Sequence, residues 1–434
     1  MNSENAVGKI EDTMVPLEGV DDLDALVQAI GDADFVLLGE ASHGTSEFYT
    51  WRAELSKKLI AEKGFSFIAV EGDWPSCYTL NRYVKQYVGS ASNAREALRN
   101  YTRWPTWMWA NEEILQFTQW LYDYNKPQLV KNKVGFYGID VYSLWESIDE
   151  ILKHLEKTGS PELDAARKAF ACFDPYGREP QNYGVSAAFL SESCEEEVVK
   201  LLGNLQTRRQ RCDNVDDALL SDELNALVAV NAERYFRSMV RGGPDSWNVR
   251  DHHMVEALER IKSYHGQAAK AIVWEHNTHI GDARATDMNA DGMINVGQLV
   301  REKYGEERVY VVGFGTHRGT VTASDRWGGE IKTMKVPDAQ QNSWEDIMHR
   351  AGAFDKMLLF DREESLFVEP VGHRAIGVVY NSWHDRGNYV PSIISQRYDA
   401  FIYIDESHAL SPLKQDVLHI EHSTNLCVRK RDVL

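Results

Sequence analysis

The chain has 434 residues and 43% hydrophobic content, so it can bury one large core or two moderate ones. A formal net charge of −19 at pH 7 argues against nucleic acid or an anionic membrane surface as a partner. No apolar run reaches the length of a membrane span, and residues 1–22 lack the basic start and apolar core of a signal peptide.

The cysteines indicate a reducing compartment. They are scattered along the chain, and no two of them form a Cys-x-x-Cys pair. This usage favours free thiols over disulfides or a thiolate zinc site, so we expect a cytoplasmic protein. The cysteines are Cys77, Cys172, Cys194, Cys212 and Cys427.

From residue 34 to about 158, short β-branched or aromatic runs alternate with segments of helical periodicity. Such alternation is typical of βαβ units, and it predicts an α/β fold with a mostly parallel central sheet flanked by helices. The predicted strands are 34–40, 65–71 and 134–140, and the predicted helices are 45–63, 76–88 and 144–157.

Residues 159–266 differ from this pattern, because they are long polar segments with a helical period and almost no strand signal. We interpret them as an inserted helical cap subdomain that folds over the sheet edge. Strand patterns then resume, so residues 1–158 and 267–434 are predicted to form two halves of one α/β catalytic domain. The later predicted strands are 269–276, 309–314, 331–336, 356–361, 374–380 and 400–405.

Four of the predicted strands break off at an acid or a histidine. The positions are Glu40 with His43, Glu71, Asp140, and His276. Parallel strands end at one edge of a sheet, so we expect these side chains to converge there. Carboxylates and imidazoles are costly to bury without a partner or a task, and the cluster therefore predicts an active site.

His43 is the candidate general base. It lies just before a predicted helix, whose positive N-terminal dipole disfavours a charged imidazole. A neutral His43 can take a proton from water near pH 7, with Glu40 orienting the ring or with Glu40 or Glu71 holding the water. Taken alone, the segment with Glu40 and His43 is typical of an ordinary loop that caps a helix. The acids and the histidine at the ends of the other three strands favour an active site instead. No Gly-x-Ser-x-Gly turn occurs, which argues against a serine nucleophile.

Two arginines interrupt apolar helical stripes. Arg52 and Arg250 each share a stripe with hydrophobic residues, and a charge buried there needs carboxylates close by. We expect Glu71 to be the partner of Arg52, and Asp140 or Asp251 to be the partner of Arg250. A purely structural ion pair is the alternative for Arg250.

His276 and His279 flank a strand-to-loop junction and have two interpretations. Beside Glu40, His43 and Glu71 they could hold a metal ion. They could equally serve as an electrophile or proton donor for a leaving oxygen. No His-Glu-x-x-His helix is present, so we favour the metal-free interpretation and expect no cofactor.

Several blocks of this sequence resemble the erythromycin esterase family. They occur in the expected order and span roughly residues 30 to 415. The blocks are Gly39-Glu40-Ala41-Ser42-His43-Gly44 with Glu47-Phe48 and Arg52-Ala53-Glu54-Leu55, Gly64-Phe65 with Ala69-Val70-Glu71-Gly72-Asp73-Trp74-Pro75, Arg250-Asp251 with Met254, His276-Asn277-Thr278-His279, and Tyr398-Asp399 to Tyr403-Ile404-Asp405 with Ala409-Leu410 and Pro412-Leu413.

The resemblance implies hydrolysis of the lactone ester of macrolide antibiotics without a required metal. It assigns the general base to His43, the acids to Glu40 and Glu71, the supporting arginine to Arg52, and the later histidine pair to His276 and His279. A more distant kinship, with metalloproteases and haem-binding lipoproteins, keeps a metal at these residues open. Glu275 is a departure, because a small residue is expected before His276.

We therefore predict a carboxylic ester hydrolase that cleaves a macrolactone or another ester with water activated by His43, and a small-molecule ester as its partner. The alternatives are a metal-dependent hydrolase, an esterase of other substrates such as acylated sugars, and a non-catalytic small-molecule-binding relative. The residues expected to bind substrate or support the site are Arg250, Asp251, Asn277, Trp74 and Asp140.

Overall fold

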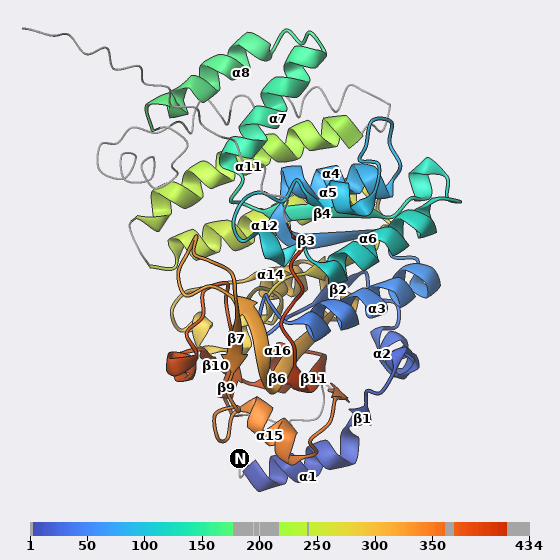
Figure 1. Cartoon of the computed structure of the whole chain (residues 1–434), viewed down its shortest axis with the longest axis vertical. Coiled ribbons are helices and arrows are strands. Elements are labelled where there is room, and N and C mark those ends of the chain that lie inside the picture. Colours follow the sequence, from blue (N-terminus) through green and yellow to red (C-terminus); the bar gives the residue numbers. More distant parts are fainter. Residues whose placement is uncertain are drawn as a thin grey trace, which may run out of the picture.

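A mostly parallel sheet forms the centre of the structure, and helices lie against it, as the prediction requires (Figure 1). The computed structural model describes residues 3–176, 194, 199, 217–240, 243–360 and 369–414. Within these residues the sheet has 9 strands in the order β1-β8-β11-β6-β2-β5-β3-β4, with β7 paired to β6. The pairs from β11 across to β4 are parallel, whereas β8 and β7 run antiparallel to their neighbours.

The strands match most of the predicted ones. Those of the main sheet are β1 (Val15–Pro16), β2 (Phe35–Leu38), β3 (Phe67–Asp73), β4 (Gly135–Asp140), β5 (Ala271–Trp274), β6 (Val309–Ala323), β7 (Lys332–Val336), β8 (Lys356–Leu359) and β11 (Ala400–Ser407). A separate hairpin joins β9 (Val371–Arg374) to β10 (Tyr389–Ser392). The predicted strand at 374–380 is wrong, because the chain leaves the β9–β10 pairing after Arg374 and Ile376 instead bridges to Ser42.

The side chains of the central strands alternate between two cores, one on each face of the sheet. Phe35 and Leu37 of β2 pack into one core, whereas Val36 and Leu38 pack into the other. This alternation follows from the two-residue period of a strand. Because both faces are covered, these strands are continuous apolar runs, as buried parallel strands usually are.

The helices divide between these two cores. The first core is covered by α1 (Ser3–Thr13), α7 (Leu144–Lys157), α8 (Leu163–Phe170), α11 (Asp217–Met239), α12 (Asp245–His265), α14 (Val296–Tyr304) and α15 (Trp344–Arg350). The second is covered by α2 (Leu23–Ile30), α3 (Ser46–Lys63), α4 (Trp74–Val84), α5 (Ala94–Leu98) and α6 (Glu112–Asn125). The short helices α13 (Asn277–Ile280) and α16 (Ile394–Arg397) lie in connecting segments.

The described part of residues 159–266 is helical and joins the first core. Helix α11 packs against α7 and α12, and α12 also contacts β4. Buried residues of α12 such as Met254 and Leu258 share a core with Phe35 of β2. Helix α12 is therefore in direct contact with the layer that carries the candidate site, and the division of the chain into two domains stays a prediction.

The expectation of free cysteines is wrong for two of the five. Cys172 and Cys194 form a disulfide, with their Cα atoms 5.8 Å apart. That separation falls within the range a disulfide spans, and it arises because the chain returns to the end of α8 after 22 residues. Cys77 is a buried free thiol, whereas Cys212 and Cys427 lie outside the described residues.

Among the helices of the described ranges, none combines the length and the apolar composition that crossing a bilayer needs.

Candidate active site

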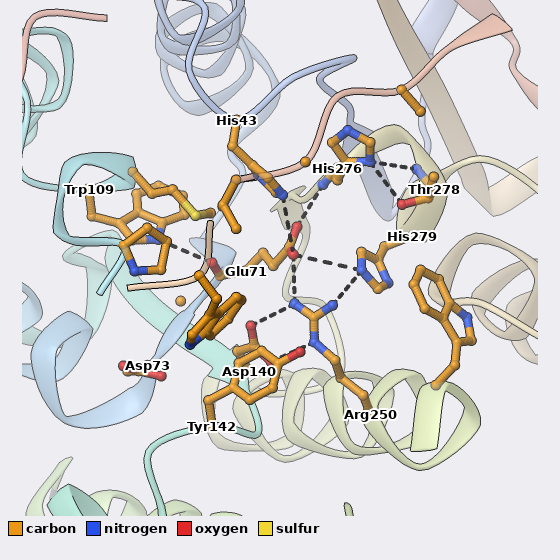
Figure 2. A pocket seen from close by; sticks show the side chains of 18 of the residues that line it. His43, Glu71, Asp73, Trp109, Asp140, Tyr142, Arg250, His276, Thr278 and His279 are labelled. Carbon is orange, nitrogen blue, oxygen red and sulfur yellow. Dashed lines mark hydrogen bonds and ion pairs between the residues drawn. The ribbon is translucent and has the colours of Figure 1, made fainter. Parts of the chain in front are cut away.

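An open cavity of about 420 Å³ lies where β2, β3, β4 and β5 end. His43, Glu71, Asp140 and His276 all line it, so the residues that follow distant strands do meet at one edge. Figure 2 shows the side chains of His43, His279 and Arg250 directed toward the Glu71 carboxylate at the centre, whereas His276 donates to that carboxylate through its backbone N–H. Aromatic residues supply much of the wall: Tyr101, Trp109, Tyr142, Trp247, Trp327 and Tyr389.

His43 is held by one ring nitrogen and presents the other to the cavity. Its Nδ1 lies 2.8 Å from Oε1 of Glu40, and its Nε2 lies 3.9 Å from Oε1 of Glu71. The Glu40 carboxylate accepts the Nδ1 proton, so Nε2 carries a lone pair that can take a proton from water. His43 lies in the turn before α3, because Gly44 lets the backbone pass close to Thr322 on β6.

Arg52 supports His43 through Glu40 and not through Glu71, which corrects the predicted pairing. Its Nη2 donates to Oε2 of Glu40 at 2.8 Å, and Arg52 is completely buried. The guanidinium also lies over the rings of Tyr49 and Trp274, at 4.3 and 4.9 Å. The prediction failed because Glu40 is closer to α3 than Glu71 is, and the strand-end pattern does not specify that distance.

Arg250 links the two acids of the neighbouring strands. Its guanidinium donates to both oxygens of Asp140, at 2.9 and 2.8 Å, and to Oε1 of Glu71 at 2.6 Å. The predicted pairing with Asp140 is therefore confirmed, whereas Asp251 faces His279. Burial raises the pKa of Asp140, but Arg250 outweighs burial, and the pKa lies below the ordinary value for an aspartate.

The hydrogen bonds of His276 and His279 define different roles for the two rings. His279 Nε2 accepts from Arg250 at 2.7 Å and its Nδ1 donates to Asp251 at 2.9 Å, so neither nitrogen is free for a ligand. In His276, by contrast, Nδ1 accepts from the backbone N–H of Thr278, so the ring proton resides on Nε2. That Nε2 is buried and lies at the backbone of Ala41, whose hydrogen bond favours the protonated ring.

His276 is consequently a neutral hydrogen-bond donor beside His43. The two ring centroids lie 4.9 Å apart. Burial and the neighbouring charge of His43 hold the pKa of His276 well below the ordinary histidine value.

The pKa of His43 shifts in the direction opposite to the one predicted from the helix dipole. Burial opposes a charged imidazole, but the carboxylates of Glu71 and Glu40 outweigh burial and raise the pKa above its ordinary value. Arg250 opposes this rise. The two carboxylates dominate because both lie within 4 Å of the ring, whereas the dipole arises from a helix that begins three residues later.

The remaining predicted residues lie farther from the cavity. Trp74, which was expected to bind substrate or to support the site, is fully buried, and its ring stacks on Tyr137 in the core. Asn277 is buried behind the site, where its amide donates to the Phe314 carbonyl at 2.7 Å. Asp251 contacts the site only through His279.

The sequence did not indicate which aromatic residues form the walls of the cavity. Trp247 stacks on His279 with ring centroids 4.4 Å apart, and it lies one helical turn before Arg250 on α12. Residues three apart share one face of a helix, so this spacing could have predicted that Trp247 lies beside the site. Trp109 lies on an irregular segment, where no periodic pattern indicates which side chains face a cavity, and Tyr389 begins the short strand β10, which was not predicted.

Glu275 is the least satisfied polar side chain near the site. It is fully buried, neither carboxylate oxygen has a hydrogen-bond partner, and burial together with the charge of Glu71 raises its pKa well above the ordinary value. The folded protein therefore binds this proton more tightly than the unfolded chain does. It follows that Glu275 lowers stability as the pH rises above its ordinary pKa of about 4.3.

We expect Glu275→Gln, which mimics the protonated acid, to leave the free energy of unfolding unchanged near pH 4. Above that pH the variant should become the more stable protein, by up to about 1.4 kcal/mol for each pH unit until Glu275 ionises. Urea unfolding across a pH series measures the difference. A difference that stays constant with pH would show that Glu275 is charged in the folded protein.

A metal ion fits this cluster poorly. Glu40, His43 and Glu71 each offer a ligand atom, and these atoms lie within 4.8 Å of one another. Both carboxylates already receive a guanidinium, however: Arg52 on Glu40 and Arg250 on Glu71. A divalent cation would have to sit beside these two positive charges, which makes the donor set unfavourable for a metal.

The fold and the cluster define an α/β protein whose sheet edge holds histidines against arginine-neutralised carboxylates around an open cavity. The chain belongs to the erythromycin esterase family, whose family model matches residues 60–407. Membership supports hydrolase activity at the level of the family.

The individual relatives are distant. The Escherichia coli protein "erythromycin esterase type II" is 20% identical over 370 residues, which cover 80% of this chain and 85% of that protein. A solved structure from Bacillus cereus has 20% identity and a TM-score of 0.79, covering 95% of this chain and 100% of its own. A mutant of the erythromycin esterase EreC in its open conformation has 16% identity and a TM-score of 0.65, with 90% and 94% covered. At these identities the solved structures establish the shared fold.

Proposed function

We propose that this protein hydrolyses a carboxylic ester, either a macrolactone or another ester, with a water molecule activated by His43. Family membership supports a hydrolase, and the geometry around His43 supports this choice of base. The observation that carries the proposal is the position of His43 Nε2, which faces the cavity 3.9 Å from Glu71 while Glu40 holds the other nitrogen.

In the proposed reaction, water binds between His43 Nε2 and the Glu71 carboxylate. His43 takes a proton as the water oxygen attacks the ester carbonyl. The C–O bond to the leaving group then breaks, and the protonated His43 returns its proton to the alkoxide. His279 has no place in these proton transfers, because Arg250 and Asp251 occupy both of its nitrogens.

Mass spectrometry after incubation with a panel of macrolides and simpler esters tests the proposal. A substrate should gain one water, or split into an acid and an alcohol. A panel in which no ester reacts, combined with tight retention of a small molecule by the purified protein, would favour a non-catalytic binding role. Turnover of acylated sugars but of no macrolide would identify an esterase of other substrates.

The raised pKa of His43 predicts the pH dependence of the rate. A general base must be neutral, so kcat/KM should rise with pH through an apparent pKa above the ordinary histidine value of about 6.5. Glu40→Gln removes one of the two carboxylates that favour the charged ring, and the rising limb should move to lower pH. A limb that stays at the same pH in this variant would argue against His43 as the titrating group.

A metal-dependent hydrolase is the second candidate, and the closeness of Glu40, His43 and Glu71 is the observation that favours it. Because two arginines already neutralise these carboxylates, we expect prolonged dialysis against a chelator to leave the rate of ester hydrolysis unchanged. Elemental analysis of the purified protein is the companion measurement. One equivalent of bound metal, with activity lost on chelation and regained on metal addition, would establish the second candidate instead.

A further inference from the structure

Two segments far apart in the sequence meet beside the cavity. Trp104 lies between α5 and α6, and Trp327 lies between β6 and β7. Their ring centroids are 4.6 Å apart, and Nε1 of Trp104 donates to the Gly329 carbonyl at 3.2 Å. Trp327 also lines the cavity, although 59% of its surface is exposed. Trp327 therefore lies at the rim of the cavity, and Trp104 contacts it from the opposite segment.

Each of these two segments is anchored where it leaves the wall of the cavity. Arg103, next to Trp104, forms a two-point ion pair with Asp73 at the end of β3, at 2.5 and 2.6 Å. The second segment begins at Ser324, whose backbone N–H donates to the Val378 carbonyl at 3.1 Å. Arg103, Asp73 and Val378 all line the cavity. The points at which the two segments are anchored thus belong to the cavity wall, whereas residues 325–328 beyond Ser324 are exposed to solvent.

The size of the cavity is limited when these segments touch. Its volume of about 420 Å³ is near the lower end of the range of roughly 300–1,000 Å³ for ligand pockets. A ligand confined to this volume is compact, and the aromatic walls favour one with an apolar or aromatic part.

We propose that Trp104 and Trp327 form a clasp that restricts this site to compact esters with an apolar or aromatic group and excludes sugar-bearing macrolactones. The inference rests on the proposed esterase function, because it assigns the substrate size for that reaction. The clasp consists of one ring contact and one hydrogen bond at an exposed rim, so its removal should enlarge the opening without disturbing the cores.

The experiment compares two substrates in the full-length protein, 4-nitrophenyl butyrate as the compact ester and erythromycin as the macrolactone. The wild type should favour the compact ester. Trp327→Ala should raise kcat/KM for erythromycin, relative to the compact ester, by about tenfold or more, since even one methylene in a hydrophobic pocket changes kcat/KM by about 10- to 200-fold. Trp104→Phe keeps a ring but loses the hydrogen bond to Gly329, and it should shift the ratio in the same direction by less.

Trp383→Ala is the matched control, because Trp383 is 92% exposed and does not line the cavity, so the substrate ratio should stay at the wild-type value. Urea unfolding of each variant confirms that the fold is retained. A wild type that prefers erythromycin, or a ratio unchanged in both clasp variants, would overturn the clasp.

A binding measurement tests the clasp separately from the proposed esterase function. If the wild type hydrolyses neither ester, the proposed function is wrong, and calorimetry of erythromycin binding then decides the clasp alone. Tighter binding by Trp327→Ala than by the wild type and Trp383→Ala would support the size restriction. Equal affinity in all three proteins would overturn it.

Discussion

Replacing His43 with alanine should lower kcat for ester hydrolysis by about 10²- to 10⁴-fold, the usual contribution of a general base. His43 is the imidazole whose Nε2 faces both the cavity and Glu71. His276 cannot substitute for it, because its Nε2 is buried and carries the ring proton. The lost rate should appear in kcat/KM as well, since the base acts only in the transition state.

The fold should survive this substitution. Without His43, Glu40 still accepts from Arg52, and Glu71 still accepts from Arg250 and from the backbone N–H of His276. No buried carboxylate is therefore left unpaired. Steady-state kinetics and urea unfolding of His43→Ala, beside the exposed control His252→Ala, measure the two effects. Near-normal hydrolysis by His43→Ala would refute its assignment as the base.

The central strands and the convergence of the site could be predicted because their signals are local and topological. An apolar run such as Phe67–Val70 has few options other than a buried strand, and parallel strands must end at one edge. Where such a run ends in Glu71 or Asp140, the position of the acid follows from the topology alone. This explains why residues separated by more than 200 positions could be placed in one cavity.

The pairing of charges could not be predicted in the same way. Arg52 lies within reach of the strand edge, but whether its guanidinium meets Glu40 or Glu71 depends on the direction of a side chain from α3. Likewise, the pKa of His43 depends on two carboxylates at 2.8 and 3.9 Å, and a sequence carries no such distances. Electrostatic effects fall off over these few ångströms, so small errors of placement change the partner and even the sign of a pKa shift.

The part of the cavity wall formed by the segment after Arg374, and the second part of β6, could not be predicted. Strand β6 was predicted to end at residue 314 but continues to Ala323, where it pairs with β7. Its polar stretch from Thr316 to Thr320 lacks the apolar run used to recognise the first part. The segment after Arg374 was predicted as a strand, yet it forms part of the cavity wall through Ala375 and Val378. Loops of this kind follow tertiary contacts, which periodicity does not report.

Arg250→Met should lower the free energy of unfolding by about 3–5 kcal/mol at neutral pH, the cost of removing one partner from a buried ion pair. The guanidinium is the shared donor to Asp140 and Glu71, and all three side chains are at least nine-tenths buried. Methionine fills a similar volume but leaves two carboxylates facing each other. The loss should therefore exceed that of Arg95→Met, whose exposed pair with Glu112 is worth about 0–1 kcal/mol.

The pH dependence distinguishes lost charge pairing from lost packing. Arg250 holds the pKa of Asp140 below its ordinary value, and the stabilisation this provides is present above about pH 4 and fades as the pH falls through the folded-state pKa. The difference between Arg250→Met and the wild type should accordingly shrink in acid, and adding Asp140→Asn to the variant should recover part of the loss at neutral pH. A deficit that is the same at about pH 3 as at neutral pH, and that Asp140→Asn does not relieve, would mean that Arg250 stabilises the site by filling space.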